Sequence, residues 1–323
     1  MYETLCEAVF PELGRYYRGK VRDNYDLDDG RRIIISTDRL SAFDRPICEI
    51  PEKGRILTAI SRYWFDYTSD ICPNHVLEYP DPNVLIAKRV KILPVEIVVR
   101  DYLAGTTNTS ILQMYKTGQR RLYGIDFPDG LVAHGPLPWT MITPTTKSAD
   151  HDLPITPKEI ISQGLMTAEQ WSRIESWALQ LFARGRAAAH QAGLILADTK
   201  YEFGADDSGE LILADEIHTP DSSRYWFADT YPHSLATGQP PLSFDKDVIR
   251  RWITDRCNPY VDDLPKIPVD LINATMNTYV DAYCRITGRE FIPLRQDEPI
   301  IARIHRNLSV VAKMQQSGQV IGK

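Results

Sequence analysis

The chain reads LILADTKYEF at residues 194–203 and LILADEI at residues 211–217. Both segments open with the same apolar Leu-Ile-Leu, and the residues between them, GADDSG at 204–209, favour a turn. The pattern therefore predicts a β-hairpin. Because side chains alternate between the two faces of a strand, Tyr201 and Phe203 are expected on one face of its first strand.

The other face of the predicted hairpin is charged. Asp198, Lys200 and Glu202 share it, and we expect Asp215 and Glu216 on the second strand. Carboxylates would then converge from adjacent strands, as a divalent cation that also binds phosphate oxygens requires. A solvated sheet face with an ion pair is the alternative interpretation of the same residues.

Composition limits the class of protein. With 323 residues, 43% of them hydrophobic, the chain can bury a large core and is expected to form two or three units. A net charge of -6 argues against a general nucleic-acid binder, although it allows a local basic pocket for phosphates. The five cysteines form no CxxC pair, which favours a reducing, cytoplasmic location. We expect no signal peptide and no association with a membrane, since no apolar run approaches the length of about 18 residues that a span requires.

The first hundred residues are predicted to be mainly sheet. Residues 14–36 favour a hairpin with its turn at 28–30. Residues 84–100 favour two strands separated near Pro94, because proline is excluded from the middle of a sheet ladder. Residues 136–157 are rich in proline, threonine and other polar residues, and we expect a long irregular segment there, of a kind that is usually functional or disordered.

Helical spacing becomes frequent later in the chain. Thr167 and Gln170 form a predicted capping box at the start of a long helix, and Gly193 marks where that helix has ended. Further helices are expected at 54–69, 243–256, 269–287 and from 299 to about 315. Because antiparallel hairpins come first and helices gather late, the order of elements predicts an α+β fold, not a doubly wound parallel sheet.

No familiar phosphate-binding or hydrolase motif occurs: the sequence has no Walker A loop, GxGxxG, HExxH or GxSxG. A phosphate site would therefore need another cradle. Gly19 would allow close approach, and Lys20 and Arg22 follow it with their charges on one face of a strand or a hairpin loop. Lys88 is a second cation on an apolar strand. Taken singly, these cations also fit a solvated strand or a snorkelling edge lysine.

Six segments together resemble the SAICAR synthetase family, and they run in its order from about residue 19 to residue 226. They read GKVRDNYDL, STDRLSAFD, AKRVKILPVEIVVRDYLAGT, TPTTKSADHD, ADTKYEFG and ADEIHTPDSSRYW. Motifs as long as VVRDYLAGT are much more specific than a short pattern. The extended PWTMITPTTKSADHD passage is similar to the longer forms of the family.

The resemblance implies an α+β fold with an antiparallel-sheet N-terminal ATP-binding domain, a second α+β domain, and ATP in the cleft between them. We expect the first domain over residues 1–98, with the nucleotide phosphate loop. A central domain over 99–240 would carry the substrate and metal residues. A helical segment over 241–323 would pack on the second domain.

The resemblance also implies an activity: a ligase of purine biosynthesis that joins L-aspartate to 5-amino-1-(5-phospho-D-ribosyl)imidazole-4-carboxylate (CAIR), with ATP and Mg2+. The products would be SAICAR, ADP and phosphate. A carboxylate is a poor acyl donor, so ATP would phosphorylate it, and the aspartate amine would attack the acyl phosphate. Three anionic substrates would need many cations and a metal. The protein is expected to be a monomer or a homodimer.

Family motifs assign expected roles to matching residues. The nucleotide is expected to contact Gly19, Lys20, Arg22, Lys88 and, near the adenine, Glu96. The metal is expected on Glu202 and Asp215. The catalytic set is Asp198, Lys200 and Arg224, where a structural ion pair between Asp198 and Lys200 is the alternative. Substrate contacts are expected from Asp38, Ser41, Arg100, Thr106, Lys147, His151, Asp152, Asp221 and Arg224, with the ribose phosphate held by arginines.

Two other functions would use the same residues. A small-molecule kinase would need the basic turn, the strand lysine and the acidic hairpin, but it would release ADP without aspartate. A nucleotide-binding regulatory module would bind ATP and show no turnover. Neither alternative accounts for Arg100 and Arg224 beside the acidic hairpin.

Overall fold

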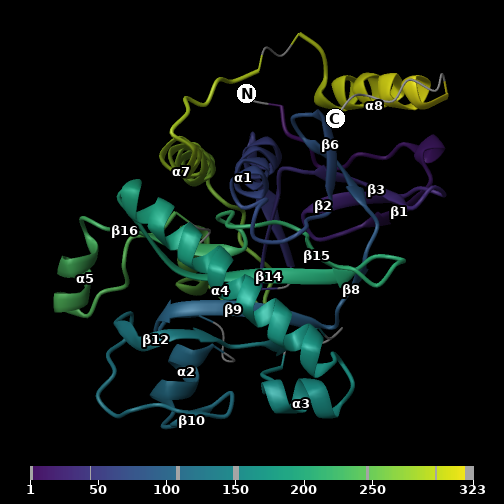
Figure 1. Cartoon of the computed structure of the whole chain (residues 1–323). Helices are drawn as coiled ribbons and strands as arrows, with labels where there is room; N and C mark the ends of the chain where they lie inside the picture. Colours follow the sequence, from purple (N-terminus) through teal and green to yellow (C-terminus); the bar gives the residue numbers. More distant parts are fainter. Residues whose placement is uncertain are drawn as a thin grey trace. The chain divides into compact units, whose positions relative to one another are not determined.

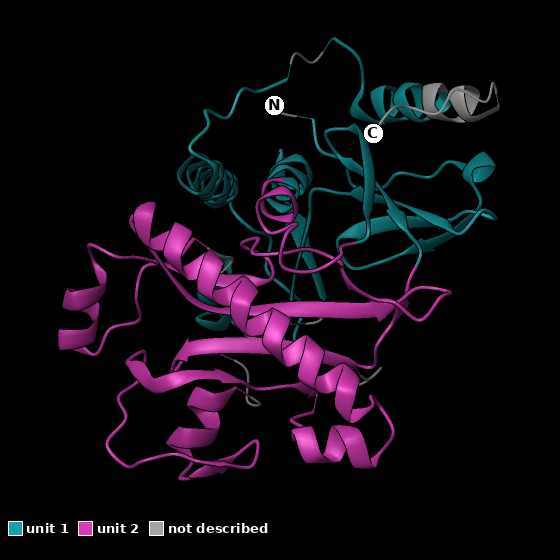
Figure 2. Ribbon diagram, viewed as in Figure 1, with its two compact units in different colours: residues 1–62, 75–89, 246–323 teal, residues 63–74, 90–245 magenta. Residues whose placement is uncertain are grey.

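The computed structural model describes residues 3–43, 45–106, 110–147, 153–244, 247–294 and 297–316, and its elements are labelled in Figure 1. The chain divides into two compact units (Figure 2). Unit 1 comprises residues 1–62, 75–89 and 246–323, and unit 2 comprises residues 63–74 and 90–245. The expected division into domains at residues 98 and 240 stays a prediction.

Unit 1 contains a five-stranded antiparallel sheet of order β1-β2-β3-β7-β6. Its strands are β1 (Arg15–Arg18), β2 (Arg22–Asp26), β3 (Arg31–Ser36), β6 (Val76–Asp81) and β7 (Val84–Lys88). The hairpin predicted with its turn at 28–30 is confirmed as β2 and β3. Of the two alternatives for residues 19–22, a strand or a hairpin loop, the structure has the loop, because a second turn at 19–21 separates β1 from β2.

One face of this sheet is buried by a helix from the other end of the chain. Alternation in β3 places Ile33 and Ile35 in a core that also contains Tyr25. The C-terminal helix α8 (Ile300–Gln316) adds Ile304 and Leu308, whose spacing of four residues puts both on one helix face.

The remaining elements of unit 1 form a second core, which contains Leu40, Ile50, Ile249, Ile253 and Ile267. The elements are the hairpin β4 (Arg39–Ala42) and β5 (Arg45–Glu49), and the helices α6 (Asp247–Thr254) and α7 (Val269–Thr287). Helix α1 (Lys53–Tyr67) begins in unit 1 and ends in unit 2. The four helices predicted at 54–69, 243–256, 269–287 and 299–315 are thus confirmed, the second with shorter bounds.

Unit 2 is built on a sheet of order β12-β9-β14-β15, in which β13 also pairs with β9, and β16 and β8 pair with β14. Its strands are β8 (Lys91–Ile92), β9 (Val95–Tyr102), β12 (Pro136–Ile142), β13 (Thr145–Thr146), β14 (Leu194–Ala205), β15 (Leu211–Ala214) and β16 (Ser223–Phe227). Every strand pair that the structure describes in it is antiparallel. The predicted hairpin is confirmed as β14 and β15.

Helix α4 (Ala168–Gln191) covers one face of this sheet (Figure 1). It begins at the predicted capping box of Thr167, and its buried Trp177 stacks on Phe203 of β14, with ring centroids 6.2 Å apart. Tyr201 is also fully buried. The predicted alternation is therefore confirmed: α4 takes the aromatic face of β14, and the opposite face presents Asp198, Lys200 and Glu202.

Two further expectations for unit 2 were wrong. The second hairpin strand ends at Ala214 instead of residue 217, because Asp215 adopts a left-handed φ of 65° that a strand does not allow. Residues 136–157 do not form one irregular segment, since β12 and β13 pair with β9. Met141 of β12 is buried, and the prolines and threonines of this segment had obscured the strand pattern in the sequence.

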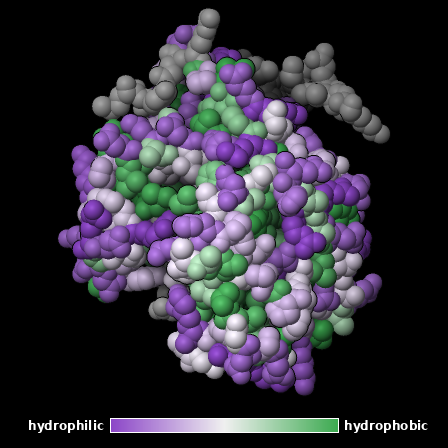
Figure 3. Space-filling view, turned by 90° about the vertical axis from the view of Figure 1, so that its left-hand side faces the viewer, coloured by the Kyte–Doolittle hydropathy of each residue, from purple (hydrophilic) through white to green (hydrophobic). Residues whose placement is uncertain are grey.

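Several short elements were not predicted from the sequence, because each is too short for periodicity to reveal it. They are the helices α2 (Ile111–Lys116), α3 (Pro157–Ser162) and α5 (Tyr231–Thr237), the 3-10 turn η1 (Pro11–Leu13), and the small hairpin of β10 (Arg121–Leu122) and β11 (Ile125–Asp126). Among the described helices, none has the length and apolar character needed to cross a membrane. In Figure 3, hydrophilic and hydrophobic residues are interspersed over the face in view.

Candidate active site

Four charged residues form a cluster of alternating sign on the face of the unit 2 sheet opposite α4. Lys200 of β14 donates from Nζ to Glu96 Oε1 of β9 at 3.0 Å and to Glu202 Oε1 at 2.8 Å. Lys147, which follows β13, bonds to Glu202 and has its Nζ 4.0 Å from Glu96 Oε1. The strand order brings these residues together, because β14 lies beside β9 and β13 pairs with β9.

The carboxylates around Lys200 determine its charge. Burial alone would lower the pKa of Lys200, but the carboxylates of Glu202, Glu96 and Asp215 outweigh it and raise the pKa above its ordinary value. Lys200 is therefore an ammonium group throughout the physiological pH range. It can donate hydrogen bonds to an anion and stabilise negative charge, but it cannot serve as a general base.

A second cluster on the same face joins two arginines to one carboxylate. Asp198 Oδ2 accepts from Arg100 Nη1 at 2.5 Å and from Arg224 Nη1 at 2.6 Å. The register explains this, since Asp198 pairs with Arg100 of β9 on one side and with Arg224 of β16 on the other. The alternative ion pair between Asp198 and Lys200 was wrong, because each bonds to other partners. Two guanidinium groups on one carboxylate leave an excess positive charge, which suits an anionic ligand.

The segment after β15 places Asp215 near Lys200. It is anchored by His218, which sequence reasoning missed: the ring of this buried histidine bonds to the hydroxyl of Tyr201, and its backbone oxygen accepts from Tyr225 at 2.8 Å. His218 also has a left-handed φ of 50°. The sequence offered no signal for this role, because a single histidine after a strand has many possible roles.

The predicted metal ligands Glu202 and Asp215 both face the Lys200 ammonium, one by a hydrogen bond and one by its charge. Within the described residues, no group of three or more His, Cys, Asp or Glu side chains is arranged to hold a metal. Mg2+ is commonly bound by one or two carboxylates together with substrate phosphates, so a pair of carboxylates fits that chemistry. The metal site stays a prediction.

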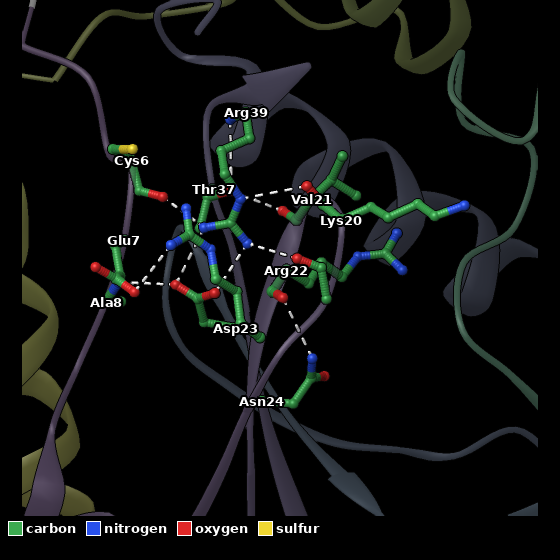
Figure 4. A network of polar contacts seen from close by, with 12 residues as sticks. Cys6, Glu7, Ala8, Lys20, Val21, Arg22, Asp23, Asn24, Thr37 and Arg39 are labelled. Carbon is green, nitrogen blue, oxygen red and sulfur yellow. Dashed lines mark hydrogen bonds and ion pairs between the residues drawn. The ribbon is translucent and has the colours of Figure 1, made fainter. Parts of the chain in front are cut away.

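In unit 1, the predicted phosphate residues Gly19, Lys20 and Arg22 lie in and beside the turn between β1 and β2. Gly19 donates its N–H to the backbone oxygen of Arg22 at 2.8 Å, which closes the turn around Lys20 and Val21. A buried arginine that was not predicted, Arg39, lies against this turn (Figure 4). It belongs to the STDRLSAFD motif, in which only Asp38 and Ser41 are predicted substrate contacts.

Asp38 and Ser41 bond to backbone groups in unit 1. Asp38 accepts from the N–H groups of Leu5 at 2.8 Å and Gly54 at 2.9 Å. Burial raises its pKa to about 6, although those two backbone hydrogen bonds oppose the shift. The Ser41 hydroxyl donates to the Arg45 backbone oxygen at 3.2 Å. Their substrate contacts stay predictions.

The other predicted residues are placed individually. Lys88 ends β7, and its backbone N–H donates to the His75 oxygen at 2.7 Å. Thr106 is exposed in the loop after β9, and the Asp221 N–H donates to Thr219 Oγ1 at 3.3 Å. The predicted contacts of His151 and Asp152 lie outside the described residues.

Comparison with known proteins gives a consistent result. The family model for SAICAR synthetase matches residues 15–267. A protein of Agrobacterium fabrum, provisionally named phosphoribosylaminoimidazole-succinocarboxamide synthase 2, is 60% identical over 306 residues, which cover 94% of this chain and 97% of the relative.

Two solved structures are also similar. The SAICAR synthase from Saccharomyces cerevisiae in complex with SAICAR has a TM-score of 0.78 and 30% identity, and the match covers 90% of this chain and 100% of that one. A SAICAR synthetase in complex with ADP has a TM-score of 0.66 and 25% identity, covering 86% of this chain and 100% of that one. The family match and these similarities over nearly the whole chain show that the chain belongs to the SAICAR synthetase family.

Proposed function

We propose that the two charged clusters of unit 2 and the basic turn of unit 1 carry out the reaction of the family, in which ATP drives the joining of L-aspartate to CAIR. The reaction class, a ligase of purine biosynthesis, follows from family membership, and a small-molecule kinase is not favoured. The assignment of individual residues rests on their contacts in this structure.

The ribose phosphate of CAIR is assigned to Arg100 and Arg224. The observation that carries this assignment is that both guanidinium groups converge on Asp198 from the two strands flanking β14. Asp198 accepts from both through the same carboxylate oxygen, so one negative charge faces two positive charges and the cluster suits an anionic ligand. A phosphate is the anion whose geometry such a fork matches best.

The carboxylate chemistry is assigned to Lys200. Its ammonium group is fixed between Glu96 and Glu202, so it is already oriented before a substrate arrives. We propose that it holds the imidazole carboxylate and stabilises the charge that develops as this group becomes an acyl phosphate. Glu96 is thus assigned to orienting Lys200. Its expected contact with the adenine stays a prediction.

The nucleotide phosphates are assigned to Gly19, Lys20, Arg22 and Lys88, and Mg2+ to Glu202 and Asp215. When bound, the metal would neutralise phosphate charge. The solved family structure with ADP supports nucleotide binding by this chain. Lys147, bonded to Glu202, is assigned to substrate binding as a second cation of the same cluster. All five cysteines are free thiols, which supports the proposed cytoplasmic location.

A single substitution tests the arginine assignment. Arg224→Ala leaves Asp198 paired with Arg100, so the fold should be retained. We expect the KM for CAIR to rise at least about tenfold, which corresponds to the loss of one charge-assisted contact, while the KM for ATP changes little. Arg186→Ala is the control, because Arg186 pairs with Asp101 and its side chain is 53% exposed. Equal increases in both KM values would assign Arg224 to the nucleotide instead.

A further inference from the structure

The guanidinium group of Arg39 forms five hydrogen bonds beside the predicted phosphate turn. Its Nη2 donates to Asp23 Oδ1 at 2.8 Å and to the Gly19 backbone oxygen at 3.0 Å. Its Nε donates to the Lys20 backbone oxygen at 3.2 Å. Its Nη1 donates to Asp23 Oδ2 at 3.3 Å and to the Cys6 backbone oxygen. A guanidinium group has five N–H donors, so every donor of Arg39 has an acceptor (Figure 4).

These contacts fix the direction of two successive peptide groups in the turn. The Gly19 and Lys20 carbonyls both point at the guanidinium group. In a planar trans peptide the N–H lies opposite the C=O, so the N–H groups of Lys20 and Val21 face away from Arg39. The next carbonyl, that of Val21, accepts from the Thr37 hydroxyl at 2.8 Å and from its N–H at 3.1 Å.

The ion pair between Arg39 and Asp23 is buried. Arg39 and Asp23 are 4% and 0% exposed, and the second oxygen of Asp23 also accepts from the Ala8 N–H at 2.8 Å. The buried pair therefore has charge and hydrogen bonds satisfied, which removes the main penalty of burying ions. Lysine could not replace this arginine, because a point charge with three donors cannot reach acceptors spread around a planar fork.

We propose that Arg39 is a positioning residue, which shapes the turn at 19–21 so that its backbone N–H groups and the Lys20 side chain meet the phosphate tail of a nucleoside triphosphate. The inference deepens the proposed function and rests on the assignment of nucleotide phosphates to this turn. Arg39 acts from behind the turn through the carbonyl groups and touches no substrate. A substitution should therefore reduce phosphate binding selectively, without affecting recognition of the nucleoside.

The test compares Arg39→Lys with Arg32→Lys. Arg32 bonds to Asp26 in the same sheet, with Nε 2.6 Å from Oδ1, and serves as a matched arginine–carboxylate pair. In the full-length protein, calorimetry should show that Arg39→Lys raises the Kd of ATP at least about tenfold, while the Kd of adenosine stays within about twofold. Arg32→Lys should change neither value. A folded Arg39→Lys protein whose ATP affinity is unchanged, or whose ATP and adenosine affinities fall together, overturns the proposal.

A second variant covers the case in which Arg39→Lys does not fold. Thr37→Val removes the hydroxyl bond to Val21 but keeps the backbone bond, so a smaller loss of the same selective kind is expected. Unchanged ATP affinity in that variant would contradict the proposal. Lys20→Ala separates the two levels of inference. If it leaves ATP affinity intact, the turn does not bind phosphates and the proposed function fails there; if only Arg39→Lys has no effect, the positioning role alone fails.

Discussion

Asp215 shows how a single residue combines backbone and charge requirements. Its φ of 65° lies in the left-handed region, which asparagine and aspartate tolerate better than other residues with a side chain. Its carboxylate contributes to the raised pKa of Lys200. Asparagine at this position would keep the shape and the backbone conformation and remove only the negative charge.

We therefore expect Asp215→Asn to fold normally and to lose about 100-fold or more in turnover, because the proposed metal ligand loses its charge. Steady-state rates at several Mg2+ concentrations, with circular dichroism as the check on folding, would measure this. Asp207→Asn, in the exposed turn of the same hairpin, is the control and should leave the turnover rate unchanged. A near-normal rate for Asp215→Asn at saturating Mg2+ would contradict the proposal that Asp215 binds the metal.

His218 gives a prediction about pH. Burial lowers its pKa to about 3, whereas the unfolded chain should have the ordinary value of about 6.5. Between about pH 3 and about pH 6.5 the unfolded state therefore binds more protons at this residue than the folded state does. The stability that depends on a neutral His218 is fully present above about pH 6.5. It is lost as the pH falls, by up to about 1.4 kcal/mol per pH unit. Asp38 acts in the opposite sense, because its pKa of about 6 is raised on folding.

A variant isolates the histidine contribution from that of Asp38. His218→Asn, which suits the left-handed backbone, should be less stable than the wild type at pH 8, and the difference should shrink as the pH is lowered toward 4. Urea unfolding of both proteins across this range provides the free energies. Parallel pH profiles for the two proteins would mean that His218 does not titrate as its burial requires.

At the scale of elements, helix α4 packs closely against the segment after β15 because its residue at the contact is a glycine. A Cβ added at Gly185 would lie 2.3 Å from the His218 ring, closer than packed atoms can approach. On an exposed helix, replacing glycine by alanine would stabilise the protein by about 0.5–1 kcal/mol. Here we expect the opposite sign, a loss of about 1–3 kcal/mol, because the ring cannot move within its packed surroundings.

Thermal or chemical unfolding of Gly185→Ala measures this effect. The exposed Ala183 of the same helix supplies the converse control, since Ala183→Gly should cost only the intrinsic penalty of about 0.5–1 kcal/mol. If Gly185→Ala is as stable as the wild type, the close packing of α4 on His218 is not rigid, and the anchoring of the Asp215 segment needs another explanation.

The strands also show what local sequence can predict. Alternation placed Asp198, Lys200 and Glu202 on one face of β14 correctly, because strand periodicity is a property of the backbone itself. The end of β15 and the packing of Arg39 against the turn at 19–21 were not predicted. Both depend on partners distant in sequence, namely Tyr201 for His218, and Arg39 for the turn. Such side-chain contacts leave no local pattern.

At the scale of the whole molecule, each unit is assembled from segments distant in the chain. Unit 1 joins the N-terminal strands to α8, whose Ile304 and Leu308 complete their core, and no periodicity within either segment specifies that pairing. The α+β class was predicted correctly, because it follows from the order of hairpins and helices. The family motifs contributed the remaining information about function.

The most direct test of the ligase assignment is the release of ADP and phosphate by the purified protein with ATP, Mg2+, CAIR and L-aspartate, leaving out one component at a time. We expect sustained release of both products, together with formation of SAICAR, only when all components are present. Sustained ADP release without aspartate, with a phosphorylated product accumulating, would contradict the account and indicate a kinase.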